Sequence, residues 1–449
     1  MIKSVKKSLL AFLFTSVTCG SSAWAQTFEI DAQSQVYAGD PVDVVVSGLP
    51  PEVEVTLQAR RVLKNHYAPG APTQTYKSSA LFRADADGRV DTSTTVALEG
   101  SYQGVDQNGL LWSMRPVSDE MVSPSARLEL EASIDGVVVA ASGLDLIQVP
   151  KGYAAQEIEA LPGSYFAANL NPGDHPVIII VGGADALGVK RDTVMPQFVA
   201  KGYSVFYFAT YEIIYGSAEP TVKGLPTRYV DISIDQLDKV RDWLSKQPGV
   251  DESRIGLYGH SRNAAYVLLA ATQFDWVDAV AAIAPSDVVW EGWGDGVALG
   301  TTSSFSWGGE PLPYVPYSKN WYRETAKFGR GERGRLRTPM DEGRWENLDR
   351  VAAARIPIER YKGAVLVVGG ELDDLWSAGH MAQNIAERRA EEGLETELLV
   401  FPDAGHDLIS DGQNPIMLLY QDNATRPILA KAQAQTWQTT LDFFDQNLR

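Results

Sequence analysis

The sequence predicts a chain of two parts, in which an all-β sandwich precedes an α/β domain with a mainly parallel sheet. Three observations support this prediction. Up to about residue 150, short β-branched runs recur at roughly ten-residue spacing, which is typical of a sandwich. From about residue 155, apolar strands alternate with amphipathic helices, which favours a parallel sheet with helices on both faces. Pro150 and the following Lys151-Gly152 mark the boundary between the two patterns.

Residues 1–25 carry a processing signal. Three lysines among the first seven residues precede a short apolar run, and Ala23-Trp-Ala25 fits a cleavage site. We therefore expect a signal peptide that is cleaved after Ala25 and a periplasmic or secreted mature protein. The apolar run is too short to span a bilayer, so no membrane insertion is expected. A lipoprotein signal at Cys19 is the alternative, but Ser16-Val-Thr18 is a poor lipobox.

Composition narrows the possible chemistry. Cys19 is the only cysteine, so the mature chain has no disulfide, no thiolate metal ligand and no cysteine nucleophile. The histidines are scattered, and Gly182-Gly183 after the predicted strand 177–181 does not begin a Gly-x-Gly-x-x-Gly fingerprint, so neither a metal nor a dinucleotide cofactor is expected. The net charge of −18 disfavours nucleic acid and anionic membranes as partners. The partner class that remains is a small-molecule substrate.

Residues 27–150 should form the sandwich, of the immunoglobulin-like type. The Asp135-Gly136 pair predicts a type I′ turn between two of its strands. Alternation in Ala126–Ala132 places one face of that strand in the core. The expected strands are 42–46, 53–57, 90–96, 126–132 and 137–139.

Residues 151–449 should form the α/β domain. Fully apolar runs such as Val177–Val181 are typical of buried parallel strands. Residues 286–348 are rich in Trp, Gly and Pro with little periodicity, which indicates an excursion over the sheet. The other expected strands are 204–208, 277–284, 364–368 and 397–401, and the expected helices are 195–201, 231–246, 380–392 and 432–448.

The segment Arg254–Asn263 is the centre of the functional hypothesis. An apolar run meets Gly259-His-Ser261 and a helix-forming run follows at once, which is the strand–turn–helix context of a nucleophile elbow in an α/β-hydrolase. Gly259 meets the need for a small residue two positions before the serine, whereas Asn263 stands where a second glycine is usual. The alternative is a serine that caps a buried helix.

A serine nucleophile needs a base and an orienting acid, which in this fold follow it in the order acid, base at later strand ends. Of the five histidines, His406 alone follows a predicted strand at the correct end. His260 is adjacent to Ser261 and should point away from it. Asp373 is the expected acid, with Asp374 and Asp407 as the alternatives.

The oxyanion of an acyl-transfer intermediate needs backbone N–H donors. We expect one from Arg262, directly after the nucleophile, and one from Gly183 or Ala184, after strand 177–181. The alternative for Gly182-Gly183 is an ordinary tight turn between a strand and a helix.

Four motifs carry a resemblance to a known family. The segment Gly100–Pro116 resembles the N-terminal domain of the acyl-CoA thioesterase and bile acid-CoA:amino acid N-acyltransferase family. Gly309–Pro316, Asp373–Trp376 and Ala404–His406 resemble its C-terminal α/β-hydrolase domain. The resemblance covers essentially the whole mature chain. It implies a β-sandwich followed by an α/β-hydrolase domain, with Ser261, Asp373 and His406 at the family's nucleophile, acid and base positions.

The family cleaves acyl groups from thioesters or transfers them. The acyltransferase branch of the family resembles a variant with a cysteine nucleophile, whereas this chain has a serine at position 261. The resemblance therefore implies hydrolysis in preference to transfer to an amino acid. The signal peptide favours a carboxylic ester, an amide or a thioester of a thiol other than coenzyme A. The aromatic residues of 286–348 would suit an apolar acyl group, and the alternative is a satellite core packed on the hydrolase domain. We therefore expect an exported serine hydrolase. The alternatives are an acyltransferase acting on an amine or alcohol, and a non-catalytic binding protein, which Asn263 suggests.

Overall fold

The computed structural model describes residues 28–64, 73–117, 125–183, 193–214, 219–328, 330, 332, 334–415 and 425–449. The expected signal peptide and its cleavage site lie outside these residues. In the part of the chain that the structure describes, no helix is long and apolar enough to cross a membrane.

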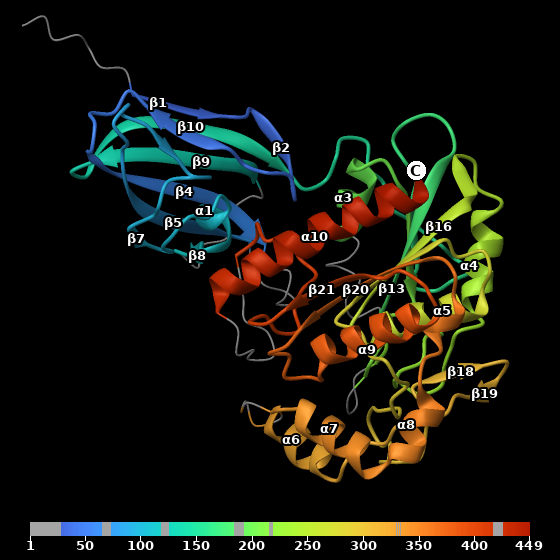
Figure 1. Ribbon diagram of the computed structural model, residues 1–449. Coiled ribbons are helices and arrows are strands. Elements are labelled where there is room, and N and C mark those ends of the chain that lie inside the picture. The colour runs from blue at the N-terminus through green and yellow to red at the C-terminus, as the bar shows by residue number, and fades with distance from the viewer. Residues whose placement is uncertain are drawn as a thin grey trace, which may run out of the picture.

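The N-terminal part consists of two β-sheets (Figure 1). The alternation expected for Ala126–Ala132 is present from Leu128, because Leu128, Leu130 and Ala132 are buried and the residues between them are exposed, whereas Ala126 is exposed. A three-stranded sheet has the order β1 (Glu29–Ala32), β3 (Val44–Ser47) and β6 (Val90–Asp91). The larger sheet has the order β2 (Gln35–Tyr37), β10 (Val137–Ile147), β9 (Ser125–Ile134), β4 (Glu54–Lys64), β5 (Thr73–Arg83) and β7 (Glu99–Gly100), with β8 (Arg115–Pro116) also beside β5.

Two turn-level predictions had different outcomes. Asp135 and Gly136 have φ of 51° and 78°, so the type I′ turn between β9 and β10 is confirmed. The strand expected over 90–96 is wrong beyond Asp91. The carbonyl of Asp91 accepts the N–H of Thr95 at 2.7 Å, and its carboxylate accepts the N–H of Ser93 at 3.0 Å. These local bonds close a turn in place of the sheet ladder.

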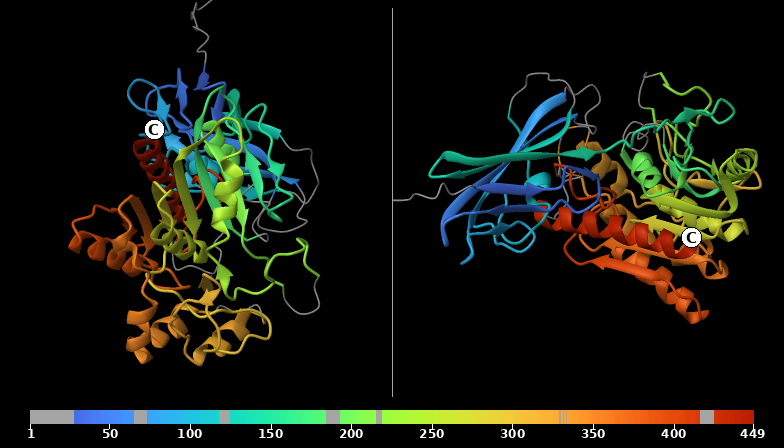
Figure 2. Two further views of the ribbon diagram at one scale, coloured as in Figure 1. Left: turned by 90° about the vertical axis from the view of Figure 1, so that its right-hand side faces the viewer. Right: turned by 90° about the horizontal axis from the view of Figure 1, so that it is seen from above.

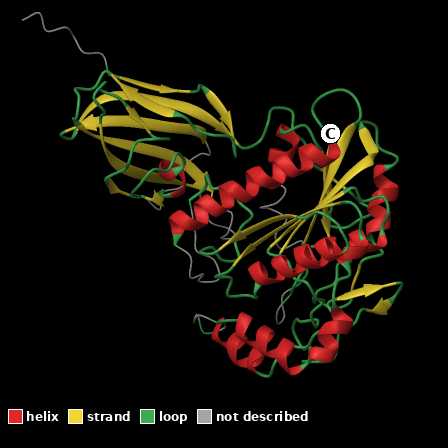
Figure 3. Cartoon of the chain, viewed as in Figure 1, coloured by secondary structure: helices red, strands yellow, loops and turns green. Residues whose placement is uncertain are grey.

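The second part is built on an eight-stranded sheet that is parallel from β14 to β21 (Figure 3). The strand order is β11 (Gln156–Glu157), β12 (Tyr165–Ala167), β14 (Ser204–Ala209), β13 (His175–Gly182), β16 (Val250–His260), β17 (Ala279–Ile283), β20 (Ala364–Gly370) and β21 (Glu397–Phe401). Two of its pairings are antiparallel, that of β11 with β12 and that of β12 with β14. The predicted mainly parallel sheet is confirmed.

Helices cover both faces of this sheet (Figure 2). In β13, Ile178 and Ile180 join the core that contains α3 (Met195–Ala200) and α10 (Arg426–Leu448). Ile179 and Val181 point to the other face and join the core that contains three further helices. These are α4 (Leu237–Leu244), α5 (Arg262–Gln273) and α9 (Ala378–Glu391). A strand covered on both sides has no solvent face, which explains its fully apolar sequence.

Two predictions in this part are wrong. The helix expected over 231–246 begins only at Leu237, because Ile232 and Ser233 form strand β15, which pairs with β18 (Phe305–Trp307). The excursion is more regular than its sequence suggests. It contains β19 (Glu310–Pro311), α6 (Asn320–Phe328) and α7 (Arg337–Glu346), and α8 (Leu348–Ala354) follows directly.

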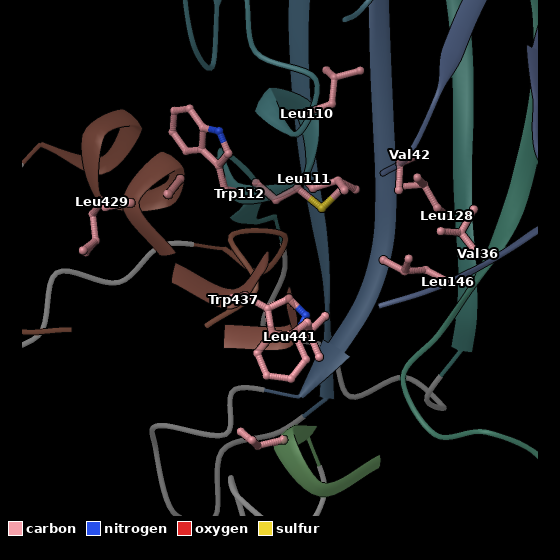
Figure 4. Packing of buried hydrophobic residues seen from close by; sticks show 14 of the residues in the cluster. Val36, Val42, Leu110, Leu111, Trp112, Leu128, Leu146, Leu429, Trp437 and Leu441 are labelled. Carbon is pink, nitrogen blue, oxygen red and sulfur yellow. The ribbon is translucent and has the colours of Figure 1, made fainter. Parts of the chain in front are cut away.

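The two parts share one apolar core. Trp437 and Leu441 of α10 belong to the same buried cluster as Val36 and Leu146 of the sandwich (Figure 4). The short helix α1 (Gly109–Trp112) contributes three of its residues to this cluster. The motif Gly100–Pro116 therefore lies where the sandwich packs on α10.

Candidate active site

Ser261 lies at the sharp turn between β16 and α5. Its φ of 63° and ψ of −129° are rare for a residue with a side chain, and a conformation of this kind costs about 1–3 kcal/mol. Neighbouring bonds hold it in place. Its N–H donates to the carbonyl of Ile283 at 2.9 Å, and its carbonyl accepts the N–H of Ala264 at 2.9 Å. The side chain of Ser261 makes no capping hydrogen bond to α5, which argues against the alternative of a helix cap.

The elbow needs a small residue at Gly259. A Cβ atom there would lie 2.3 Å from the carbonyl oxygen of Asn263 and 2.9 Å from Val267 Cγ2. Asn263 itself lies within the first turn of α5 and is not among the residues of positive φ. The close approach therefore constrains Gly259, and position 263 accommodates a side chain. Its Oδ1 is buried and has no hydrogen-bond partner in the structure.

The structure brings Ser261, His406 and Asp373 together. His406 Nε2 lies 2.9 Å from Ser261 Oγ, and His406 Nδ1 lies 2.7 Å from Asp373 Oδ2. The side chains of His406 and Asp373 are almost fully buried, at 1% and 0% exposed. A neutral imidazole that donates from Nδ1 to the carboxylate has Nε2 free to accept the serine proton.

The loop after β20 fixes the Asp373 carboxylate. Its Oδ1 accepts the N–H of Leu375 at 2.8 Å and the N–H of Trp376 at 3.2 Å, which leaves Oδ2 for His406. Of the two alternatives considered for the acid, Asp374 accepts the N–H of Arg337 through its carbonyl at 2.8 Å. Asp407 accepts a hydrogen bond from Gln433 through its carbonyl at 2.8 Å. Nδ1 of His406 faces Asp373, because it lies 2.7 Å from Oδ2 of that carboxylate.

Two residues beside His406 were not identified from the sequence. His260 was expected to point away from Ser261, and its Nε2 lies 3.1 Å from the carbonyl oxygen of His406, with the two rings 5.0 Å apart. Trp376 packs edge-on against the His406 ring at 4.7 Å, and its Nε1 donates to the carbonyl of Pro285 at 3.0 Å. The sequence signals for these roles are the position of His260 next to the serine and that of Trp376 in the motif Asp373–Trp376.

Of the expected oxyanion donors, two are described. Arg262 is the first residue of α5, so its backbone N–H lies at the positive end of that helix. Gly183 is buried directly after β13, and its carbonyl accepts the hydroxyl of Tyr207 at 2.5 Å. Ala184, the other candidate, lies outside the described residues.

The side chain of Arg262 links the elbow to the excursion, a contact that the sequence did not indicate. It donates to the hydroxyl of Tyr317 and lies over the rings of Tyr317 and Trp376, 5.6 and 5.5 Å from their centres. Burial raises the pKa of Tyr317 to about 12, so its hydroxyl stays protonated at neutral pH and donates to the carbonyl of Glu291 at 3.0 Å. The excursion is thereby held against the residue that follows the serine.

A second contact joins the excursion to the acid loop. Arg337 at the start of α7 donates through Nη1 to the carbonyls of Glu371 and Asp373, at 2.7 and 3.2 Å. Among the described residues, no three His, Cys, Asp or Glu side chains come together as a metal ion would need. The arrangement thus combines a serine hydroxyl, an imidazole and a carboxylate, which is the set that acyl transfer requires.

Comparison with known proteins agrees with the sequence resemblance. Residues 39–134 match the acyl-CoA thioester hydrolase/BAAT N-terminal region, and residues 341–449 match the BAAT/acyl-CoA thioester hydrolase C-terminal region. The chain is 26% identical to acyl-coenzyme A thioesterase 1 of Mus musculus, over 94% of this chain and 97% of that protein. It is 24% identical to acyl-coenzyme A amino acid N-acyltransferase 1 of Mus musculus, over 93% of this chain and 97% of that protein. Among solved structures, the acylaminoacyl peptidase of Pyrococcus horikoshii aligns with 83% of this chain and 54% of its own, at 12% identity and a TM-score of 0.41, a likeness too distant to bear on function.

Proposed function

Because the chain belongs to the acyl-CoA thioester hydrolase/BAAT family, we propose that it is a serine hydrolase that cleaves an acyl thioester or carboxylic ester with Ser261, His406 and Asp373. The observation that carries the proposal is the unbroken line of hydrogen bonds, 2.9 Å from Ser261 Oγ to His406 and 2.7 Å from His406 to Asp373. The relative named acyl-coenzyme A thioesterase 1 supports a thioester as one substrate class.

In the proposed mechanism, Ser261 Oγ attacks the acyl carbonyl and its proton passes to His406 Nε2. Asp373 keeps the imidazole oriented and stabilises the imidazolium that forms. The N–H of Arg262, together with that of Gly183 or Ala184, stabilises the tetrahedral oxyanion. The carbonyl reforms as the leaving group takes the proton from His406 and departs as a thiol or an alcohol. His406 then takes a proton from the water molecule that attacks the acyl-serine, and returns it to Ser261 Oγ as the acid is released.

We also propose that the protein is exported and that residues 27–150 and 151–449 are its two domains. The charged and apolar segments before Ala25 support export. Coenzyme A thioesters are scarce outside the cytoplasm, so an ester or another thioester is the expected substrate. Trp293 and Tyr314 of the excursion pack against the apolar core of the α/β part. N-terminal sequencing of the mature protein tests the cleavage after Ala25.

Acyl transfer is the second candidate. The similarity to a relative named as an N-acyltransferase favours it. In this reaction an amine or alcohol replaces water as the acceptor, and the steps up to the acyl-serine are the same. The two functions therefore differ only in what reaches the acyl-serine.

A panel of p-nitrophenyl esters and thioesters of several chain lengths, including an acyl-CoA, tests the proposal. Wild type should hydrolyse one class, and Ser261→Ala should reduce kcat by several orders of magnitude, because it removes the nucleophile. Product analysis with and without an added amine separates hydrolysis from transfer. If Ser261→Ala turns over substrate as fast as wild type, Ser261 is not the nucleophile. Absence of turnover and of fluorophosphonate labelling in wild type would favour the non-catalytic alternative.

A further inference from the structure

We propose that the N-terminal sandwich positions the base of the active site, and that Arg61 and Gln413 are the positioning residues through which it acts. This inference rests on the proposed function, since it gives the sandwich a part in the reaction of Ser261 and His406. The observation behind it is a buried set of hydrogen bonds between the sandwich and the segment that follows His406.

The segment Asp407–Gln413 follows His406 directly and contains no helix or strand. It is nevertheless buried, with Leu408, Asp411 and Gln413 at 0%, 4% and 2% exposed. A buried loop must satisfy its polar groups through bonds to other elements. Its first residue, Asp407, is held by Gln433 of α10. Hydrogen bonds to the sandwich hold its other end, at Gln413.

Three hydrogen bonds connect Gln413 to the sandwich. Its Oε1 accepts the backbone N–H of Gly39 at 2.9 Å, and its Nε2 donates to the carbonyl of Asp40 at 2.5 Å. Its own carbonyl accepts Nη1 of Arg61, on β4, at 3.0 Å. Gly39 also lies against α10, because its φ is 91° and a Cβ there would lie 2.5 Å from Nε1 of Trp437.

Asp411 completes the set from the other side. Its Oδ2 accepts Gln197 of α3 at 2.6 Å, and its Oδ1 accepts the N–H of Gln413 at 2.9 Å. Burial lowers the pKa of Arg61 to about 10, and the Asp411 carboxylate opposes this, so the guanidinium keeps its charge at neutral pH. A buried and satisfied polar set of this kind specifies one loop geometry.

The consequence concerns His406. Its ring must reach both Ser261 and Asp373, and its backbone lies between β21 and this loop. A displacement on the scale of 1 Å can cost about 100-fold in rate. The loop between β21 and α10 has no strand pairing of its own at 407–413, so the contacts with the sandwich and α10 add to the bonds from His260 and Asp373 in positioning His406. The sandwich is then a structural part of the active site.

Lys201 provides a matched control. Its Nζ pairs with the carboxylate of Asp40, so it also joins the sandwich to the α/β part. No bond between Lys201 and the loop is present in the structure, and its side chain is 29% exposed. Lys201→Met therefore removes the ion pair to the Asp40 carboxylate and leaves in place the Asp40 carbonyl, which accepts from Gln413.

The test compares Gln413→Leu and Arg61→Met with Lys201→Met in the full-length mature protein. The readouts are the rate constant for fluorophosphonate labelling of Ser261, corrected for the folded fraction, and the downfield proton NMR signal of His406 Nδ1–H. We expect Gln413→Leu and Arg61→Met to label about 10-fold more slowly or worse and to lose or shift the signal. Lys201→Met should match wild type, and Arg61→Lys, which keeps a charged donor, should recover part of the rate.

The inference is overturned if folded Gln413→Leu and Arg61→Met label as fast as Lys201→Met and keep the signal. If Gln413→Leu does not fold, Gln413→Glu decides. It keeps the acceptor for Gly39 but loses the donor to Asp40 and adds a charge beside Asp411, so a wild-type rate overturns the inference and a slower rate supports it. If wild type itself is not labelled, both the proposed function and the inference fail. If wild type and all variants are labelled equally fast, the inference alone fails.

Discussion

Replacing Asp373 by asparagine tests the assigned acid most sharply, because the structure determines how the new amide must lie. Oδ1 of Asp373 accepts two backbone N–H groups, from Leu375 and Trp376. An asparagine must keep its oxygen there, since its NH₂ group would otherwise face two buried donors. Its NH₂ group then points at Nδ1 of His406.

In that orientation the imidazole is held in the wrong tautomer. Nδ1 accepts from the amide, so the ring proton sits on Nε2, which donates to Ser261 and cannot take its proton. Recovering the active tautomer requires the amide to flip and leave two donors unsatisfied, at about 1–3 kcal/mol each. The expected loss in kcat is therefore between about 30-fold and 10,000-fold, the upper end being typical when a triad carboxylate becomes an amide.

The assay is kcat for the best ester or thioester, with Asp374→Asn as the matched control. The carbonyl of Asp374 accepts a bond from Arg337, and we place its carboxylate outside the reaction. We expect Asp374→Asn to change kcat by less than about 5-fold. The reasoning is refuted if Asp374→Asn or Asp407→Asn costs more than Asp373→Asn with all three proteins folded.

Three further changes test other parts of the account. Gly259→Ala should lower kcat/KM by about 100-fold or more without unfolding the chain. The reason is that the added Cβ would lie 2.3 Å from the carbonyl oxygen of Asn263 and so displace the turn that carries Ser261. Wild-type kinetics would contradict the elbow geometry. Burial alone would raise the pKa of Glu324, but its hydrogen bonds, including those from the Arg335 N–H and neighbouring cations, lower the pKa from 4.5 to about 2. The ionised Glu324 carboxylate thus stabilises the fold above about pH 4.5, and this stabilisation is lost as the pH falls toward 2. Glu324→Gln should therefore make the melting temperature depend less steeply on pH in this window. An unchanged slope would refute the lowered pKa of Glu324. Trp437→Ala should reduce the free energy of unfolding by about 3–5 kcal/mol in urea titrations, since the side chain is 3% exposed in the shared core; a change below about 1 kcal/mol would show that the junction is loosely packed.

The candidate site could be read from the sequence because each member follows a strand whose pattern is local. Apolar runs before Ser261, Asp373 and His406 predict parallel strands, and the carboxyl ends of parallel strands meet at one edge of a sheet. The structure brings these three side chains together. From the sequence alone Asn263 departs from the elbow pattern, because the sequence does not reveal that the close backbone contact falls on Gly259.

What could not be predicted depends on contacts between residues far apart in the chain. Ile232 is in a strand because it pairs with Phe305, although its own neighbours follow a helical pattern. The role of His260 depends on the carbonyl of His406, a residue 146 positions away. The bonds from Gly39 and Arg61 to Gln413 are likewise invisible in local sequence, since they span more than 350 residues.

Trapping the acyl-enzyme is the most direct test of the central claim. Wild type is mixed with the best substrate, quenched in acid on the millisecond scale and analysed by intact mass and peptide mapping, beside Ser261→Ala. The account predicts an added acyl mass on the peptide that contains Ser261, formed before the acid product and absent from Ser261→Ala. Rapid turnover with no adduct at Ser261, or an adduct on another residue, would contradict it.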